Sequence, residues 1–309
     1  MRKLIFLFLP FYTTLSFSQK SPIATIPFEI NEKGLMIIKL KINGVEVSNF
    51  VLDTGSSITV IDDDSAEKLG LQFKAEKAQL TEASSTNNQV EKTIPQEITI
   101  NRKVKLKGLI LYVSDLSKYG DINGIIGFDL FRKYISETIF DKKIIHFYKR
   151  INSKNTREYQ SIDFVESYCT PEVLVTFSLA NGEIFSGKAL FDTGNVKSPL
   201  IINSTFAEEN YLTEKFESVF LTTDEGVNVN SNGISTIIET LKFGEFIFSE
   251  MPISLSKTKE GVLAWEGYLG ILGLELISKF NFILDYKAKK IYFRPSANFK
   301  EIFNALRQN

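Results

Sequence analysis

A short motif occurs twice in this chain of 309 residues: three apolar residues followed by Asp, Thr and Gly. The first copy, FVLDTGS, spans residues 50–56, and the second, ALFDTGN, spans residues 189–195. The apolar residues predict the end of a buried strand, and the small polar residues predict a tight turn that holds the aspartate at the strand exit. At average residue usage, about one chain in fifteen of this length contains a single Asp-Thr-Gly by chance. Two copies in the same local context therefore indicate a duplicated structure.

The sequence around the two motifs repeats as well. An Asn-Gly pair, the strongest signal for a two-residue hairpin turn, ends at Gly44, 9 positions before the first aspartate, and at Gly182, 10 positions before the second. A Gly-Ile-apolar-Gly element follows each aspartate, after 71 positions at residues 124–127 and after 78 positions at residues 270–273. We therefore predict a mainly β chain with two homologous β-barrel-like lobes.

A chain of this length with 43% apolar residues is large enough for two such lobes. We predict an N-terminal lobe over residues 19–150, a linker over 151–165 and a C-terminal lobe over 166–309. The linker is inferred from residues 149–162, which are rich in Lys, Arg, Asn, Ser and Glu.

Residues 1–18 have the pattern of a signal peptide. Two basic residues precede the apolar stretch Leu4–Leu9, and small residues occur at Ser16 and Ser18. The apolar stretch is too short to anchor the chain across a bilayer. We expect an exported protein, periplasmic or secreted, that begins near Gln19 and has no stable membrane insertion after signal removal.

The composition excludes several kinds of chemistry. Lys and Arg (36) nearly balance Asp and Glu (37), which gives no reason to expect a nucleic-acid partner. Cys169 and His146 are the only residues of their types, so a Cys/His metal site and a disulfide within the chain are excluded, and Ser-His-Asp catalysis is disfavoured. The acidic triplet at residues 62–64 is interpreted as a solvated turn. Catalysis would then depend on carboxylates, with no metal or cofactor.

With its two Asp-Thr-Gly motifs and the Gly elements that follow them, the chain resembles the aspartic proteases of the pepsin and retroviral type over residues 23–295. Within that family it resembles the exported bacterial branch described as retropepsin-like. The resemblance implies a bilobal fold with a pseudo-two-fold axis, a monomer with an internal pseudo-dimer. It also implies that Asp53 and Asp192 meet in a shared cleft as the catalytic residues of an endopeptidase acting on peptides or proteins.

The chemistry of two adjacent carboxylates agrees with this resemblance. Two such groups about 3 Å apart cannot both ionise cheaply, so one of them keeps a proton near neutrality, and aspartic proteases are the standard example. The ionised carboxylate can take a proton from water while the neutral one protonates the peptide carbonyl.

The resemblance also assigns supporting roles beside the two aspartates. The Thr hydroxyls interlock across the axis, the glycines permit close approach, and the Ser56 hydroxyl bonds the outer oxygen of the aspartate. Asn195 stands where the family usually has Ser, Thr or Ala. These residues are Thr54, Gly55, Ser56, Thr193, Gly194 and Asn195.

Polar residues 79–92 predict a projecting hairpin in the first half, and residues 222–228 occupy the corresponding place in the second. Family members commonly cover the substrate with a Gly-rich or Tyr-bearing hairpin, yet residues 79–92 contain neither Gly nor Tyr. Two alternatives therefore stand beside the endopeptidase: a catalytically weak or inactive peptide-binding module on the same fold, and a β-rich envelope protein with accidental turns. The last leaves the duplication unexplained.

Overall fold

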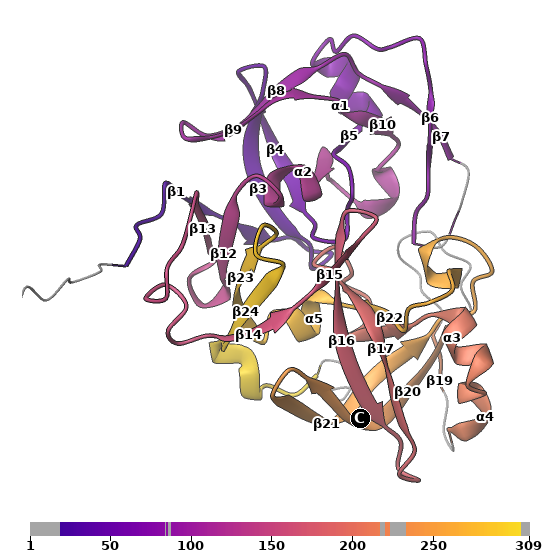
Figure 1. Cartoon of the computed structure of the whole chain (residues 1–309). Coiled ribbons are helices and arrows are strands. Elements are labelled where there is room, and N and C mark those ends of the chain that lie inside the picture. The colour runs from indigo at the N-terminus through magenta and orange to yellow at the C-terminus, as the bar shows by residue number, and fades with distance from the viewer. Residues whose placement is uncertain (1–18, 84, 86–87, 217–219, 223–232, 304–309) are drawn as a thin grey trace, which may run out of the picture.

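The computed structural model describes residues 19–83, 85, 88–216, 220–222 and 233–303. Figure 1 shows two lobes, each built around its own β-sheet, and a third sheet that lies beside both. The predicted signal peptide, residues 1–18, and nearly all of the polar stretch 222–228 lie outside the described residues. Within the described residues, no helix has the length and apolar character needed to cross a membrane.

The sheet of the first lobe runs in the order β6-β7-β10-β5-β11-β4-β3-β8-β9, and β2 pairs with β3. Its strands are β2 (Glu29–Ile30), β3 (Met36–Ile42), β4 (Val45–Leu52), β5 (Val60–Asp62), β6 (Ala78–Leu80), β7 (Asn88–Lys92), β8 (Gln96–Asn101), β9 (Val104–Leu109), β10 (Tyr112–Ser114) and β11 (Gly124–Ile126). The short helices of this half are α1 (Asp63–Lys68), η1 (Ser117–Tyr119), α2 (Phe128–Phe131) and η2 (Phe140–Lys142).

The sheet of the second lobe runs in the order β15-β16-β17-β22-β18-β21-β20-β19. Its strands are β15 (Val165–Ser167), β16 (Thr170–Ser178), β17 (Ile184–Phe191), β18 (Leu200–Ile202), β19 (Phe220–Thr222), β20 (Gly233–Phe243), β21 (Phe246–Leu255) and β22 (Gly270–Leu272). Its helices are α3 (Ser204–Glu209), α4 (Leu212–Lys215), η3 (Val262–Ala264), α5 (Leu274–Ile277) and η4 (Ala297–Lys300).

The third sheet joins the two halves of the chain, in the order β1-β13-β12-β23-β24-β14. Its strands are β1 (Ala24–Pro27), β12 (Ile135–Ile139), β13 (Ile144–Tyr148), β14 (Gln160–Asp163), β23 (Phe280–Asp285) and β24 (Lys290–Pro295). At its centre β12 of the first half pairs antiparallel with β23 of the second. Part of the predicted linker contributes to this sheet, because β14 pairs with β24. The domain boundaries themselves stay a prediction.

The local patterns account for the hairpins that lead to each aspartate. Asn43 and Gly44 have φ angles of 49° and 89°, the left-handed conformation of a two-residue hairpin turn. Buried positions alternate along β3, whereas the last three residues of β4, which end at Leu52, are all buried. The change from alternation to continuous burial marks the point where the strand enters the interior between lobe and shared sheet.

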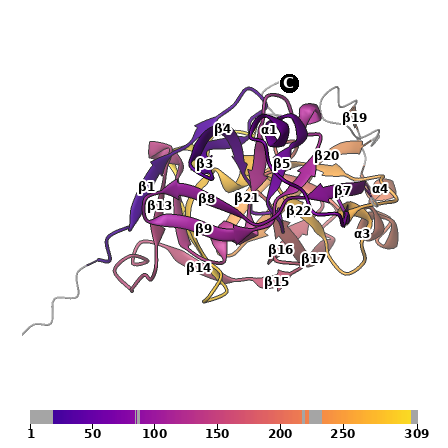
Figure 2. The same cartoon turned by 90° about the horizontal axis from the view of Figure 1, so that it is seen from above.

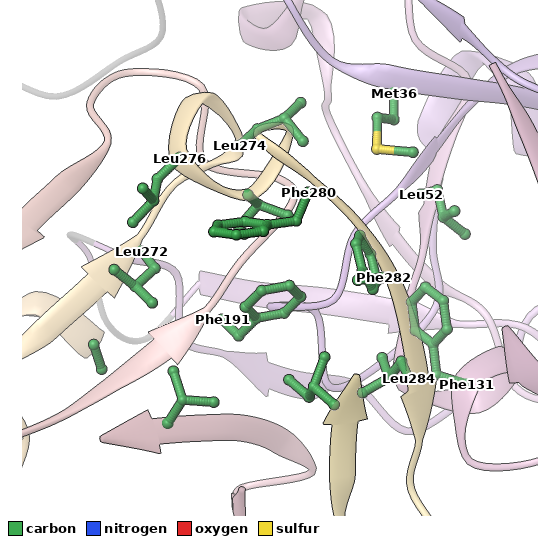
Figure 3. Packing of buried hydrophobic residues seen from close by; sticks show 14 of the residues in the cluster. Met36, Leu52, Phe131, Phe191, Leu272, Leu274, Leu276, Phe280, Phe282 and Leu284 are labelled. Atoms are coloured by element: carbon green, nitrogen blue, oxygen red, sulfur yellow. The ribbon is translucent and has the colours of Figure 1, made fainter. Parts of the chain in front are cut away.

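Large apolar side chains fix both Asp turns from behind. Figure 3 shows Leu52 and Phe191, which directly precede the two aspartates, on opposite sides of Phe282 from β23. The rings of Phe191 and Phe282 are 5.2 Å apart in an edge-to-face arrangement, and all three residues belong to one buried core. The shared sheet therefore supports the ends of β4 and β17 together.

One detail differs from the sequence-based expectations. The acidic triplet does not form a simple solvated turn, because Asp62 caps α1 by accepting a hydrogen bond from Ser65 N, and the helix begins at Asp63.

Candidate active site

Two strands with the same local pairing deliver the two aspartates. β4 pairs in parallel with β11, and Asp53 N donates to Ile126 O at 3.0 Å just beyond the strand end. In the second lobe β17 pairs in parallel with β22, and Asp192 N donates to Leu272 O at 3.1 Å. Each aspartate is therefore held where its strand leaves the sheet.

The glycines of the Gly-Ile-apolar-Gly elements allow these strands to pack against the Asp turns. A methyl group at Gly127 would lie 2.3 Å from Asp53 O and from Ser56 O, and one at Gly273 would lie 2.1 Å from Ser198 O. Because these neighbours are backbone atoms that cannot move aside, only glycine fits at either position. Both elements therefore pack directly against the Asp turns.

The two threonines interlock across the lobe interface, as the resemblance implies. Thr54 Oγ1 donates to Phe191 O at 2.6 Å and accepts from Thr193 N at 3.0 Å. The partner bonds mirror these: Thr193 Oγ1 donates to Leu52 O at 3.0 Å and accepts from Thr54 N at 3.0 Å. Both threonines are 1% exposed, so water cannot replace these bonds.

This interlock brings the two carboxyl groups together. The side chains of Asp53 and Asp192 are close enough for each to shift the pKa of the other. Each also faces the turn of the other lobe: a methyl group at Gly55 would lie 2.5 Å from Asp192 Cγ, and one at Gly194 would lie 2.5 Å from Asp53 Cγ. Gly55 and Gly194 therefore permit the close approach that the resemblance implies.

The two carboxyl groups differ in their surroundings. Burial raises the pKa of Asp53, and hydrogen bonds from Asp192 and from the N–H groups of Gly55, Ser56 and Gly194 oppose this rise. Burial, and then the negative charge of Asp53, raise the pKa of Asp192 well above its usual range. Two carboxyl groups this close cannot both ionise cheaply, so the pair shares one proton near neutrality, and this proton belongs to the pair as a whole.

One supporting residue acts differently from the prediction. The Ser56 hydroxyl donates to Ile58 O at 2.8 Å, so it does not bond the outer oxygen of Asp53, and it is the backbone N–H of Ser56 that supports that carboxylate. The carbonyl oxygen of Ile58, two residues along the chain, is a nearer acceptor for the Ser56 hydroxyl than the carboxylate of Asp53.

Asn195, which departs from the family pattern, serves its own turn. Its N–H donates to Asp192 Oδ1 at 3.2 Å, as Gly194 N does at 2.7 Å. Its side chain accepts from Lys197 N and donates to Ser198 O. The Asn195 amide therefore fixes the turn, and its backbone N–H contributes to the dyad.

The predicted projecting hairpin consists of β6 and β7, which pair antiparallel. Figure 1 shows it extending from the first lobe toward the second, and Figure 2 shows β7 on the same side of the molecule as α3 and α4. Backbone hydrogen bonds connect the lobes here: Val262 N of η3 donates to Glu82 O at 3.1 Å, and Leu263 N donates to Ala83 O at 2.8 Å. No local pattern of residues predicts this contact.

Beside this hairpin lie further residues that the sequence did not single out. Lys118 Nζ pairs with Glu82 Oε2 at 2.6 Å, and both side chains are about four-fifths buried. The same Lys118 lies over the ring of Tyr119. Burial, and then the charges of Glu82, Asp53 and Asp192, raise the pKa of the Tyr119 hydroxyl, which places this residue near the dyad.

In the described part of the chain, one group of carboxylates is compact enough to hold a cation: Asp62, Asp63 and Asp115. Oxygens of Asp62 accept from Ser65 N and Leu116 N, and Asp115 accepts from the nearby Ser117 N. These bonds identify Asp62 as the N-cap of α1 and connect Asp115 to the first residue of η1.

The threonine interlock leads to a direct prediction. Thr54→Val keeps the shape of the side chain but leaves a buried carbonyl and a buried N–H without partners, and each costs about 1–3 kcal/mol. Thr54→Ser loses one methyl group and keeps both bonds. Urea unfolding should therefore find the Val variant less stable than the Ser variant. A Val variant at least as stable as the Ser variant would show that the interlock contributes nothing.

Comparisons with known proteins can now be set beside this geometry. Residues 38–130, which include the first Asp turn and its Gly element, match a family model described as Aspartyl protease. Among curated proteins, none matches the chain in sequence. The solved structures that match include the crystal structure of an aspartic proteinase from Irpex lacteus, with a TM-score of 0.59 and 12% sequence identity over 91% of this chain and 99% of that one. The first lobe thus matches the aspartic protease family, and the chain as a whole has the bilobal fold of an aspartic proteinase.

Proposed function

We propose that this protein is an aspartic endopeptidase that hydrolyses peptide bonds in peptides or proteins with Asp53 and Asp192. The observation that carries the proposal is the pair of adjacent carboxyl groups, held by interlocked turns from two lobes so that each carboxyl group lies against the glycine of the opposite turn. As whole residues, Asp53 and Asp192 are half-buried, whereas Thr54 and Thr193 beside them are fully buried.

In the proposed reaction, a water molecule between the carboxyl groups attacks the peptide carbonyl carbon. Ionised Asp53 takes a proton from this water, and protonated Asp192 gives its proton to the carbonyl oxygen, which produces a neutral gem-diol. Asp53 then protonates the departing nitrogen while Asp192 recovers a proton from a diol hydroxyl. The C–N bond breaks, and the dyad regains its single proton.

The protonation states give the reaction a pH window. Activity falls at low pH, when Asp53 is protonated and the pair carries two protons. It also falls at high pH, when Asp192 loses the shared proton. Because burial raises the pKa of both groups, the window lies above the range in which an ordinary aspartate titrates.

The test is hydrolysis of an unbiased peptide mixture from pH 3 to 8, followed by mass spectrometry. Asp53→Asn and Asp192→Asn should each lower turnover by about a thousandfold or more while the variants stay folded, because an amide can neither activate water nor return the proton. Asp163→Asn, an exposed aspartate paired with Lys290, serves as the matched control and should keep wild-type turnover.

Two outcomes contradict the proposal. Near-wild-type turnover in either folded dyad variant excludes the paired-carboxylate mechanism. A wild-type protein that binds peptides and cleaves none is the peptide-binding module, the alternative that the unusual hairpin and Asn195 leave open.

The proposal includes export to the periplasm or the medium, which rests on the sequence of residues 1–18. It also includes a monomeric state, which rests on the presence of both lobes in one chain. N-terminal sequencing of the protein from its native source should find a chain that begins near Gln19. An intracellular chain that begins at Met1 would contradict export without affecting the proposed chemistry.

A further inference from the structure

The turn between β15 and β16 has an unusual composition for its shape. Ser167 and Thr170 pair across the hairpin, and the two residues between them, Tyr168 and Cys169, have φ angles of 47° and 69°. This left-handed turn is normally made by Asn-Gly or Gly-Gly, because a side chain costs about 1–2 kcal/mol there. A bulky aromatic residue at such a position calls for an explanation.

Burial does not compensate for this strain. Tyr168 is 74% exposed, and its one described ring partner is Trp265, at 4.7 Å between ring centroids. Trp265 is the only tryptophan of the chain, and it is held in place because Asn203 Nδ2 donates to its carbonyl oxygen at 3.0 Å. The two rings are tilted by 50° to each other and form an aromatic corner, which is held through the Trp265 backbone and is open to solvent at Tyr168.

On one side, the turn that carries Tyr168 is connected to the Asp53 turn through two aromatic residues. The Tyr286 hydroxyl donates to Cys169 O at 3.2 Å, and its ring lies 5.4 Å from that of Phe128. Phe128 N donates to Ser56 O at 2.9 Å, on the back of the Asp53 turn. One tyrosine and one phenylalanine therefore separate the strained turn from the catalytic motif.

On the other side, Trp265 directly follows η3, the segment to which the β6–β7 hairpin is bonded through Glu82 and Ala83. The aromatic pair thus lies between the Asp53 turn and the place where the hairpin meets the second lobe. Figure 1 shows the β15–β16 hairpin rising from the second lobe toward the first.

We infer that Tyr168 and Trp265 form a subsite that selects an aromatic or large aliphatic side chain of the bound peptide, a few residues from the scissile bond. This inference rests on the proposed function for the presence of a peptide. An extended peptide at the dyad is long enough to reach the pair, since each residue spans about 3.3 Å. Stacking between aromatic rings contributes about 0.5–1.5 kcal/mol beyond the buried area.

The test uses Tyr168→Gly, which removes the ring and adopts the left-handed turn without strain, so that the fold is retained. Tyr168→Phe keeps the ring. Tyr211→Gly is the matched control, because Tyr211 is also 70% exposed and has a φ of 51°. The substrates are peptides in which a single Phe replaces Ala at successive positions on either side of the cleaved bond.

Wild type, Tyr168→Phe and Tyr211→Gly should prefer Phe over Ala at one position by about three- to tenfold in kcat/KM, the range that corresponds to the stacking contribution. In Tyr168→Gly this ratio should fall to near one. A Tyr168→Gly variant that keeps the wild-type preference at every position overturns the inference.

A second readout does not depend on hydrolysis. In the Asp192→Asn background, the same peptides are titrated, and the Phe peptide that binds most tightly should change the fluorescence of Trp265, the only tryptophan, and should bind three- to tenfold more weakly to Tyr168→Gly. This titration decides the inference even if the wild-type protein cleaves nothing, which would refute only the proposed function. Binding of the Phe peptide without any change in Trp265 fluorescence, and with the same affinity in Tyr168→Gly, overturns the subsite.

Discussion

The main constraint on this structure is the contact between two carboxyl groups, those of Asp53 and Asp192, in the interior of the protein. Such a contact is unfavourable between two charges, and it becomes favourable only when one proton is shared and both groups are held rigidly. The Thr54 and Thr193 interlock provides this rigidity, because each hydroxyl bonds the backbone of the opposite turn. Behind the turns, Leu52 and Phe191 are anchored in one core that includes Phe282 of the shared sheet. Two supports therefore hold the aspartates together. The pairing of β12 with β23 supports the Asp turns from behind, and the threonines connect the two turns at the lobe interface.

The near-symmetry of the two lobes does not extend to their electrostatics. Both turns offer the aspartate the N–H groups of the residues that follow it, but Asp53 also receives Gly194 N from the other lobe. This additional donor opposes the rise in the pKa of Asp53. Two nearly equal turns therefore give their aspartates different surroundings. Asn195, the residue that departs from the family pattern, contributes through its backbone N–H, and its amide is used within its own turn.

Much of this arrangement could be predicted because its signals are local. The Asp-Thr-Gly turns, the Asn-Gly hairpins and the paired glycines each depend on a few neighbouring residues, and Gly127 and Gly273 pack as expected. The structure adds to or differs from the predictions where a segment had competing partners. Ser56 had a nearer acceptor in Ile58 O, and part of the predicted linker became β14 because the edge of β24 was available to pair with it. Contacts between distant segments, such as Glu82 with Val262 or Tyr168 with Trp265, leave no pattern in a single sequence.

The shared proton is the central claim, and the pH dependence of stability tests it most directly. The folded dyad binds its proton more tightly than the unfolded chain does, so the wild-type protein should lose stability as pH rises from the ordinary aspartate range through the raised pKa of Asp192. Each unit by which that pKa is raised corresponds to about 1.4 kcal/mol. The measurement is the free energy of unfolding between pH 4 and 8 for wild type and the double variant Asp53→Asn/Asp192→Asn. The account predicts that the double variant gains stability relative to wild type as pH increases, because it has no proton to lose at this site. A stability difference that stays constant over this range would contradict it.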